Sequence, residues 1–374
     1  PSVTRASTIL FNSMQELAQH EKKIKANKKI SYYSYGRYGS STTIELENIL
    51  KELEQAYHVF LTGTGFGGVA LAIMSLCRPG DEILVSDNVY GPTKEISEGL
   101  VKEFNIEAKF YNPDKFEDLK NKVTKKTKMI LVENPGSNTF EFQDLSKIVN
   151  LAKKKNILTF LDNTWGTPLY LKPLKIGFDM SFCSATKYFS GHSDAMGGSL
   201  AVNKKVFKKV MFFYKLSGYR MSADEAYLII RGLRTLDIRL KKHHENTKII
   251  INFLKKQKKI KEILYPHKPS SKSYKLWKKY YSGANGLFSI VIKSKKKSSV
   301  VRFVNSLELF GIGYSWGGFE SLALLQDLRA KTKYTEARQY LRFTKDEHIV
   351  RLHVGLEDPK DLIQDLKKSL RYIK

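Results

Sequence analysis

The sequence predicts an α/β protein, in which a large and mostly parallel sheet is followed by a smaller α/β unit. Strand-like and helix-like segments alternate from residue 44 to residue 203, and the pattern changes after a long helical stretch at 227–254. Such alternation is typical of βαβ units, whose parallel strands carry helices on both faces of the sheet. The chain has 374 residues, of which 42% are hydrophobic, so it is long enough for two or three domains.

The elements of the larger part are each expected from a local apolar pattern. Residues 1–36 are polar and irregular except for a helix-like segment at 14–25, and they predict an arm rather than a domain. Short apolar runs predict strands, and apolar residues spaced three or four apart predict helices. The expected helices lie at 44–57, 69–77, from 93 onward and at 145–155, and the expected strands lie at 59–61, 82–86, 108–111, 129–132, 157–161, 180–184 and 199–203.

The sequence pattern changes again beyond the helical stretch at 227–254. We place the boundary near residue 234, so that an arm at 1–36 and a large domain at 37–233 precede a C-terminal α/β domain at 234–374. The elements expected in this last domain are strands at 287–293 and 348–354 and helices at 299–307 and 361–370.

The charge of the chain raises the alternative of a basic nucleic-acid-binding protein. The net charge is +27, from 64 basic and 37 acidic residues. The lysine pairs recur along the whole chain, on expected polar helix faces or in turns, and no nucleic-acid-binding motif accompanies them. A solvated, lysine-rich surface therefore explains the charge better, and no nucleic-acid partner is expected, although anionic substrates would be attracted.

The cysteines and the hydropathy predict a cytoplasmic protein. Cys77 and Cys183 lie among apolar or small residues, which predicts buried free thiols in a reducing compartment. No apolar run approaches the ~20 residues of a membrane span. No basic segment followed by an apolar core marks a signal peptide, although a few residues are expected to precede Pro1.

A glycine-rich segment predicts a phosphate site. Gly63, Gly65 and Gly68 follow the spacing G-x-G-x-x-G between an expected strand and an expected helix, and Asp87 ends the next strand. This arrangement imitates a dinucleotide-binding fingerprint, so an NAD-dependent oxidoreductase is one alternative. Free N–H groups at a helix N-terminus bind any phosphate, however, so the segment does not specify which phosphate compound is bound.

Lys187 and Asp162 indicate which phosphate compound is bound. Both lie at the C-terminal ends of expected strands. Lys187 comes after the strand at 180–184, beside the hydroxyls of Ser184 and Thr186, which can donate to phosphate oxygens. A desolvated lysine can form an imine with an aldehyde. Asp162 ends the strand at 157–161, at the edge where open α/β sheets bind ligands, and a carboxylate there can keep a pyridinium nitrogen protonated. The combination predicts a pyridoxal phosphate (PLP) site.

Five longer motifs extend this pattern along the chain. They are Tyr35-Gly36-Arg37 followed by Gly39, Asp162-Asn163-Thr164-Trp165, Ser184-Ala185-Thr186-Lys187-Tyr188 with Gly191-His192-Ser193-Asp194, Arg231-Gly232-Leu233-Arg234-Thr235-Leu236, and Arg351-Leu352-His353-Val354-Gly355-Leu356-Glu357-Asp358. With these motifs the chain resembles, from residue 5 to its C-terminus, the Cys/Met-metabolism family of PLP-dependent enzymes, and most closely its cystathionine β-lyases. The resemblance implies the PLP-dependent transferase fold, fold type I.

The resemblance also implies a role for each site residue. Lys187, Tyr90 and Tyr35 form the catalytic set, in which Lys187 carries the cofactor, and Asp162 faces its pyridine nitrogen while Tyr90 stacks on its ring. Tyr35 and Arg37 reach the cofactor phosphate of a neighbouring subunit, so at least a dimer, and more specifically a homotetramer, is expected. The remaining implied phosphate ligands are the backbones of Gly65 and Phe66 and the side chains of Ser184 and Thr186. The implied substrate-binding residues are Arg351, which takes the α-carboxylate, with Ser137, Tyr314, Ser315 and Trp316.

The segment around Tyr314 favours β-elimination within this family. The γ-acting members usually carry a glutamate where this chain has Tyr314. The expected reaction is cleavage of L-cystathionine to homocysteine, pyruvate and ammonia in methionine biosynthesis. A cystathionine γ-lyase or γ-synthase, and a broad-specificity member that racemises alanine, remain alternatives. Phe66 departs from the small residues usual in β-lyases, which limits its phosphate role to the backbone.

Two histidine-containing patterns are expected to carry no chemistry. His192, Ser193 and Asp194 are adjacent, whereas a nucleophilic triad needs side chains that converge from separate segments. His243 and His244 are neighbours on an expected helix, so their side chains cannot share a face to bind a metal. No metal site is expected.

Overall fold

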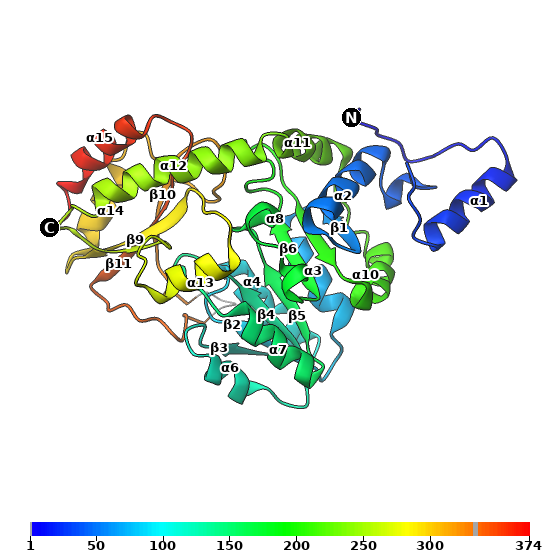
Figure 1. Cartoon of the computed structure of the whole chain (residues 1–374), viewed down its shortest axis with the longest axis horizontal. Helices are drawn as coiled ribbons and strands as arrows, with labels where there is room; N and C mark the ends of the chain where they lie inside the picture. The colour runs from blue at the N-terminus through cyan, green and yellow to red at the C-terminus, as the bar shows by residue number, and fades with distance from the viewer. Residues whose placement is uncertain (1, 332–335) are drawn as a thin grey trace.

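A computed structural model describes residues 2–331 and 336–374 and contains two sheets, one in each main part of the molecule (Figure 1). The larger sheet has the strand order β1-β7-β6-β5-β4-β2-β3. Strands β6 to β3 in this order are parallel, and only β7 runs antiparallel to its two neighbours, so the prediction of a mostly parallel sheet is confirmed. The strands are β1 (His58–Thr62), β2 (Glu82–Ser86), β3 (Glu107–Tyr111), β4 (Thr127–Glu133), β5 (Leu158–Asp162), β6 (Met180–Ser184) and β7 (Gly198–Val202).

Helices cover both faces of this sheet, because successive side chains of a buried strand point to opposite sides. Ile83 and Val85 of β2 pack in one apolar cluster with α3, α4 and α10, whereas Leu84 packs in another that includes α6 and α7. Helices α2 and α11 cover Val59 and Leu61 of β1. The helices of this part are α2 (Ser41–Glu54), α3 (Gly65–Leu76), α4 (Gly91–Glu98), α5 (Leu100–Glu103), α6 (Phe116–Lys122), α7 (Leu145–Lys155), α8 (Thr167–Tyr170), α9 (Pro173–Ile176), α10 (Lys204–Ser217) and α11 (Ala223–Leu233).

The smaller sheet is antiparallel, with the order β10-β11-β9-β8. Helix α12 (Leu236–Leu254) runs from α11 toward this sheet and contacts both β8 and α15 (Figure 1). The division near residue 234 falls between α11 and α12 and stays a prediction. The other elements of this part are β8 (Ile260–Leu264), α13 (Lys272–Tyr280), β9 (Leu287–Lys293), α14 (Lys297–Asn305), β10 (Leu322–Gln326), β11 (Glu347–His353) and α15 (Pro359–Leu370).

The helical stretch expected at 227–254 is confirmed, and it is divided between two helices, α11 and α12. Arg239 explains how the break is stabilised. Its guanidinium donates to the carbonyl of Gly232 (2.7 Å), at the C-terminal end of α11, and to the carbonyl of Tyr188 (2.9 Å). Its Nε also donates to the hydroxyl of Thr235 (3.0 Å), the N-cap residue of α12. Arg239 therefore links the ends of both helices to Tyr188, the residue that follows Lys187.

The N-terminal arm projects away from the rest of the chain (Figure 1). Its helix α1 (Met14–Lys25) has the predicted bounds and begins at Ser13, whose hydroxyl accepts the Glu16 N–H group. Leu10 and Met14 are 88% and 74% exposed, which is costly for apolar side chains that stay in water. This arrangement suits an arm that packs on another subunit, as expected from the sequence.

No helix in the described part of the chain combines the length and the apolarity that a membrane crossing requires.

Candidate active site

A cavity of about 210 Å³ lies at the C-terminal ends of β5 and β6, beside the N-terminus of α3. In open α/β sheets this edge is where ligands bind, because the parallel strands deliver their last side chains and the following loops to it. The structure brings most of the predicted site residues together here. The predicted residues that line the cavity are Gly65, Phe66, Tyr90, Ser137, Asp162, Ser184, Thr186, Lys187 and Trp316.

Lys187 brings an amine to the cavity. Its Nζ donates to Ser315 Oγ (2.6 Å) and lies 5.5 Å from the ring centroid of Trp316. Burial lowers its pKa to about 8, and the positive charge of Arg351 acts in the same direction, while Asp162 opposes the shift. A lysine of lowered pKa is more often neutral near pH 7, and the neutral amine is the form that attacks a carbonyl or takes a proton.

Asp162 is held in place by Thr164. Its Oδ1 atom accepts hydrogen bonds from the backbone N–H group (2.9 Å) and the hydroxyl (2.6 Å) of Thr164. The same hydroxyl accepts the N–H group of Ser184 (2.9 Å), which links the carboxylate to β6. Burial raises the pKa of Asp162 to about 6, although the Thr164 bonds and Lys187 lower it. Its Oδ2 atom has no hydrogen-bond partner within the described residues, and a free carboxylate oxygen in the cavity wall suits a protonated ring nitrogen.

The start of α3 forms the other end of the cavity. Thr64 is the N-cap residue and its hydroxyl accepts the Gly67 N–H group (3.0 Å), whereas the first N–H groups of any helix lack a helical carbonyl partner. A Cβ atom at Gly65 would lie 2.5 Å from Ser184 Oγ, so glycine is required for the helix to begin beside this hydroxyl. The N–H groups of Gly65 and Phe66 together with the Ser184 hydroxyl therefore fit a phosphate.

Thr186 is placed at the same end but is already hydrogen-bonded. Its hydroxyl accepts the N–H group of Gly197 (3.0 Å) and lies 3.3 Å from the carbonyl oxygen of the same residue. Its predicted role as a phosphate donor would require the hydroxyl to exchange the bond to this carbonyl for one to the phosphate. That role stays a prediction.

Arg351 of β11 brings a buried positive charge to this region. The residue is 8% exposed, and its Nη2 donates to the carbonyl of Ser315 (2.9 Å). No acidic side chain of the described residues pairs with it, so a structural salt bridge does not account for the charge. Burial lowers its pKa to about 10. Arg351 also lines a smaller cavity with Ser137, Asp162 and Trp316, where a ligand carboxylate could supply the missing negative charge.

The turn at Ser315 links Lys187 to Arg351. Its hydroxyl accepts the Lys187 bond and its carbonyl accepts the Arg351 bond. Ser315 has φ 76°, a left-handed conformation that is costly outside glycine and is frequent at functional sites. Gly317 has φ 90°, and a Cβ atom there would lie 2.9 Å from the Tyr188 nitrogen, so glycine lets the turn pack on the backbone after Lys187.

The sequence interpretation missed Glu133, the last residue of β4, which is paired in register with Asp162. Glu133 lines both cavities, and its Oε2 accepts the backbone N–H group of Tyr90 (2.6 Å). Burial and the nearby Asp162 raise its pKa well above the ordinary value. The signal was available, because an acid directly after the expected strand at 129–132 repeats the pattern that identified Asp162.

Five predicted site residues do not line the cavity around Lys187: Arg351 and Ser315, which are described above, and Tyr35, Arg37 and Tyr314. Tyr35 is 43% exposed at the base of the arm, and the Arg37 guanidinium lies 5.4 Å from its ring centroid. Tyr314 is 88% exposed and does not line the cavity, although its hydroxyl is close enough to raise the pKa of Arg351. The expected roles of Tyr35 and Arg37 concern a second subunit, and Tyr314 does not line the cavity. All three assignments therefore stay predictions.

Asp87, the acid of the apparent dinucleotide fingerprint, is not available to a ligand. It is 2% exposed, its Oδ1 lies 3.1 Å from Lys94 Nζ, and its Oδ2 accepts the Tyr340 N–H group (2.9 Å). A dinucleotide site needs this carboxylate for a ribose hydroxyl. The glycine-rich segment instead faces Lys187 and Asp162, so the geometry does not support the NAD-dependent alternative.

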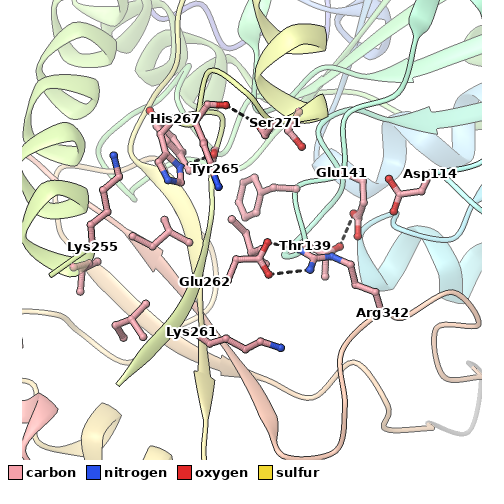
Figure 2. Close-up of a pocket in the computed structure, with 17 residues that line it drawn as sticks. Asp114, Thr139, Glu141, Lys255, Lys261, Glu262, Tyr265, His267, Ser271 and Arg342 are labelled. Atoms are coloured by element: carbon pink, nitrogen blue, oxygen red, sulfur yellow. Dashed lines mark hydrogen bonds and ion pairs between the residues drawn. The ribbon is translucent and has the colours of Figure 1, made fainter. Parts of the chain in front are cut away.

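A larger cavity, of about 480 Å³, lies elsewhere, between the segment from α12 to α13 and the loop at 139–141 (Figure 2). Its wall carries charges of both signs, including Glu262 and Arg342, which are paired with one another (Figure 2). None of the predicted site residues lines it. The predicted site residues therefore gather at the cavity around Lys187 and not at this larger one.

Comparison with known proteins identifies relatives along almost the whole chain. The model of the family described as Cys/Met metabolism PLP-dependent enzyme matches residues 1–371. The chain is 36% identical over 371 residues to the cystathionine beta-lyase of Bordetella avium, covering 99% of this chain and 91% of that protein. It is 34% identical over 381 residues to the L-alanine/L-glutamate racemase of Wolbachia pipientis, covering 99% of this chain and 92% of that protein. A crystal structure of cystathionine gamma synthase from Xanthomonas oryzae pv. oryzae gives a TM-score of 0.88 at 28% identity, covering 100% of this chain and 92% of that chain.

Proposed function

Because the chain belongs to the family of Cys/Met metabolism PLP-dependent enzymes, we propose that it is a carbon–sulfur β-lyase. The proposed reaction is the cleavage of L-cystathionine, with water, to homocysteine, pyruvate and ammonia, as a step of methionine biosynthesis. The proposal of an amino-acid substrate rests on the buried Arg351. This residue has no acidic partner in the described part of the chain, and Ser315 joins it to Lys187 through hydrogen bonds.

The cavity residues divide the proposed chemistry between them. The bound cofactor supplies an aldehyde that links to amines and a ring that withdraws electrons from the substrate Cα. Lys187 takes the Cα proton when its amine is neutral and returns a proton to the departing sulfur. Asp162 would keep the ring nitrogen protonated, and Tyr90 would stack on the ring. Arg351 fixes the α-carboxylate, which sets the position of Cα relative to Lys187.

Tyr314 supports β-elimination over γ-elimination. It stands where γ-acting members of the family usually carry a glutamate, so this chain lacks a carboxylate near the distal end of the substrate. A cystathionine β-lyase is among its relatives, but so are a γ-synthase and a racemase of comparable coverage. Product analysis must therefore separate the three activities.

The purified holoenzyme should be incubated with L-cystathionine and, separately, with L-alanine. β-Elimination gives pyruvate and homocysteine, γ-elimination gives 2-oxobutanoate and cysteine, and racemisation gives D-alanine. We expect pyruvate to be the main keto acid. A predominance of 2-oxobutanoate, or D-alanine formation faster than cystathionine cleavage, would replace the β-lyase proposal by the corresponding alternative.

Arg351→Lys should lower kcat/KM for every amino-acid substrate by roughly 10- to 100-fold. Arginine binds a carboxylate with two parallel bonds, whereas lysine offers a single point charge. Losing one charge-assisted hydrogen bond costs about 1.5–3 kcal/mol, and ~1.4 kcal/mol corresponds to tenfold. The measurement is kcat/KM with L-cystathionine and with a second amino acid. Wild-type values with both substrates would contradict the carboxylate role.

We also propose that the active site is completed by a second subunit, in a homodimer or a homotetramer. The exposure of Tyr35, Leu10 and Met14 supports this, because an arm that covers another copy would bury them. A cytoplasmic location is proposed with it, supported by Cys77 and Cys183, which are buried and unpaired.

Mixing two inactive variants tests the shared site. Arg37→Ala subunits should lose phosphate binding in the site of the neighbouring subunit. Lys187→Ala subunits should lack the lysine that carries the cofactor in their own site. Mixed oligomers should regain activity, because one site per pair then combines an intact Arg37 with an intact Lys187. A dimer that exchanges randomly should recover up to about a quarter of its sites. Absence of recovery in verified mixed oligomers would show that Arg37 acts within its own chain.

A further inference from the structure

Arg338 joins two loops of the active site, although it comes from a distant part of the chain. It lies between β10 and β11, in a segment without regular structure. Its Nη2 donates to the carbonyls of Ser137 (2.8 Å), Val89 (3.2 Å) and Asn88 (3.3 Å), and its Nη1 donates to Thr139 Oγ1 (2.8 Å). One guanidinium therefore holds the 88–89 turn and the 137–139 loop together.

The contacts of Arg338 differ from those of a structural ion pair. No carboxylate of the described residues lies within ion-pair distance of it. Its bonds go to main-chain carbonyls and one hydroxyl, and the negative charges of Glu141, Glu133 and Asp87 act on it from farther away. The planar group has five donors in fixed directions, so it can hold several acceptors of two loops at once.

Both loops carry residues of the proposed mechanism. Val89 directly precedes Tyr90, whose ring forms one wall of the cavity, and Ser137 lines this cavity and the smaller one beside Arg351. Apart from Arg338, the backbone bond from Ser137 N to Asn88 O (2.8 Å) connects the two loops. Asn88 Nδ2 also donates to Glu141 Oε2 (3.3 Å), just beyond the loop, so the Arg338 bridge adds to these direct links.

The segment around Arg338 is itself anchored to the larger part of the molecule. Tyr340 donates its N–H group to Asp87 Oδ2 (2.9 Å), and Glu336 donates its N–H group to Glu98 Oε2 (2.8 Å). Lys94 Nζ lies 3.1 Å from Asp87 Oδ1 and 3.4 Å from Glu98 Oε1, so one lysine forms ion pairs with both anchoring acids. These bonds on either side of Arg338 fix where its guanidinium can reach.

We propose that Arg338 is a positioning residue, which holds the Tyr90 turn and the Ser137 loop at the spacing that the cofactor ring and the substrate carboxylate require. The part concerning the substrate rests on the proposed function, whereas the part concerning the two loops and the bound cofactor does not. Asp87, the acid of the glycine-rich fingerprint, acts in this arrangement as an anchor for the segment that carries Arg338.

The test compares Arg338→Met with Arg342→Met in the holoenzyme. Arg342 lies four residues further along the same segment, and its guanidinium makes a two-bond ion pair with Glu262 (2.7 and 2.8 Å) (Figure 2). It makes no hydrogen bond to the 88–89 turn or to the 137–139 loop within the described residues. Each substitution removes one guanidinium and keeps a long apolar side chain. Three quantities are measured: hydrogen–deuterium exchange of peptides covering 86–92 and 134–141, circular dichroism of the cofactor band, and KM and kcat with L-cystathionine.

Arg338→Met should speed exchange in both peptides by about tenfold or more and reduce the cofactor dichroism, because the ring loses a fixed Tyr90 beside it. KM should rise about tenfold with a smaller change in kcat. Arg342→Met should leave all of these within about twofold of wild type. If Arg338→Met does not fold, Arg338→Lys keeps the charge without the fork and should give intermediate exchange in the same two peptides.

Unchanged exchange and dichroism in Arg338→Met would overturn the proposal, as would a loss of protection spread over the whole chain. If the wild-type enzyme does not cleave cystathionine, the proposed function fails. The exchange and dichroism comparisons still decide the role of Arg338 in that case.

Discussion

Replacing Lys187 by alanine should lower lyase turnover by at least about 10³-fold. The substitution removes the amine that attaches the cofactor and the group that moves the Cα proton, and a positioned acid–base group alone contributes about 10²–10⁴-fold. The fold should survive, because the side chain makes one hydrogen bond, to Ser315 Oγ. Burial of the Lys187 amine disfavours its charged form, which lowers its pKa and destabilises the folded protein. Its removal therefore also takes away a group that destabilises the fold.

The attachment itself can be mapped by borohydride reduction and peptide sequencing, with the pyridoxyl group expected on Lys187. Lys205→Ala is a suitable control, since this lysine is 51% exposed on α10 and makes an ion pair to Asp179 at 3.5 Å. The control should retain wild-type turnover. A pyridoxyl group on another lysine, or appreciable turnover in Lys187→Ala, would remove the basis of the mechanism.

Asp162→Asn should lower kcat by about 10²–10³-fold while the protein still binds the cofactor. Breaking a buried ion pair costs about 3–5 kcal/mol, and here that cost falls on the protonated ring nitrogen. The amide can still accept the two Thr164 bonds through its oxygen, so the local structure should be kept. The measurement is kcat together with the absorption spectrum and cofactor content of the same preparation.

Asp179→Asn provides the matched control for Asp162→Asn. Asp179 is also buried, but its carboxylate accepts the N–H group of Thr159 (3.0 Å) and a side-chain bond from Asn203 (2.9 Å), so its role is in packing between strands. Its substitution should lower the melting temperature with little change in kcat. The opposite pattern, with near-normal turnover in Asp162→Asn, would contradict the role assigned to the carboxylate.

Local signals predicted much of the fold and the centre of the site. Helices α1 and α7 and strands β2, β6 and β9 have the predicted bounds, since each is bounded by clear polar or turn-forming residues. Lys187 and Asp162 could be located because a functional residue at the end of a parallel strand needs only the strand to be recognised. The first turn of α3 was taken for a loop, because glycines rarely begin a helix.

Other features depend on contacts between distant segments. Strands β8 and β10 were missed because they are half-buried edge strands without strict alternation. Ser315 and Lys187 are 128 positions apart, and no periodicity connects them. Arg338 lies in a segment without regular structure, and its proposed role rests on hydrogen bonds to carbonyls of distant residues. Helix α10 was a different case, since Val206, Val210 and Tyr214 recur every fourth residue and provided a signal that was overlooked.

The two sides of the cavity come from different sheets, and this separation bears on how new activities arise in such a fold. Lys187 and Asp162 follow strands of the large sheet, whereas the 314–318 turn and Arg351 belong to the part built on the small sheet. The turn is free of regular structure, and Tyr314 points into solvent. Under the proposed function, substitutions of Tyr314 should change which substrate group is recognised while Ser315 keeps its hydrogen bonds to Lys187 and Arg351. We therefore expect substrate preference in such a fold to change through substitutions at an exposed position like Tyr314, while the contacts among Lys187, Ser315 and Arg351 are kept.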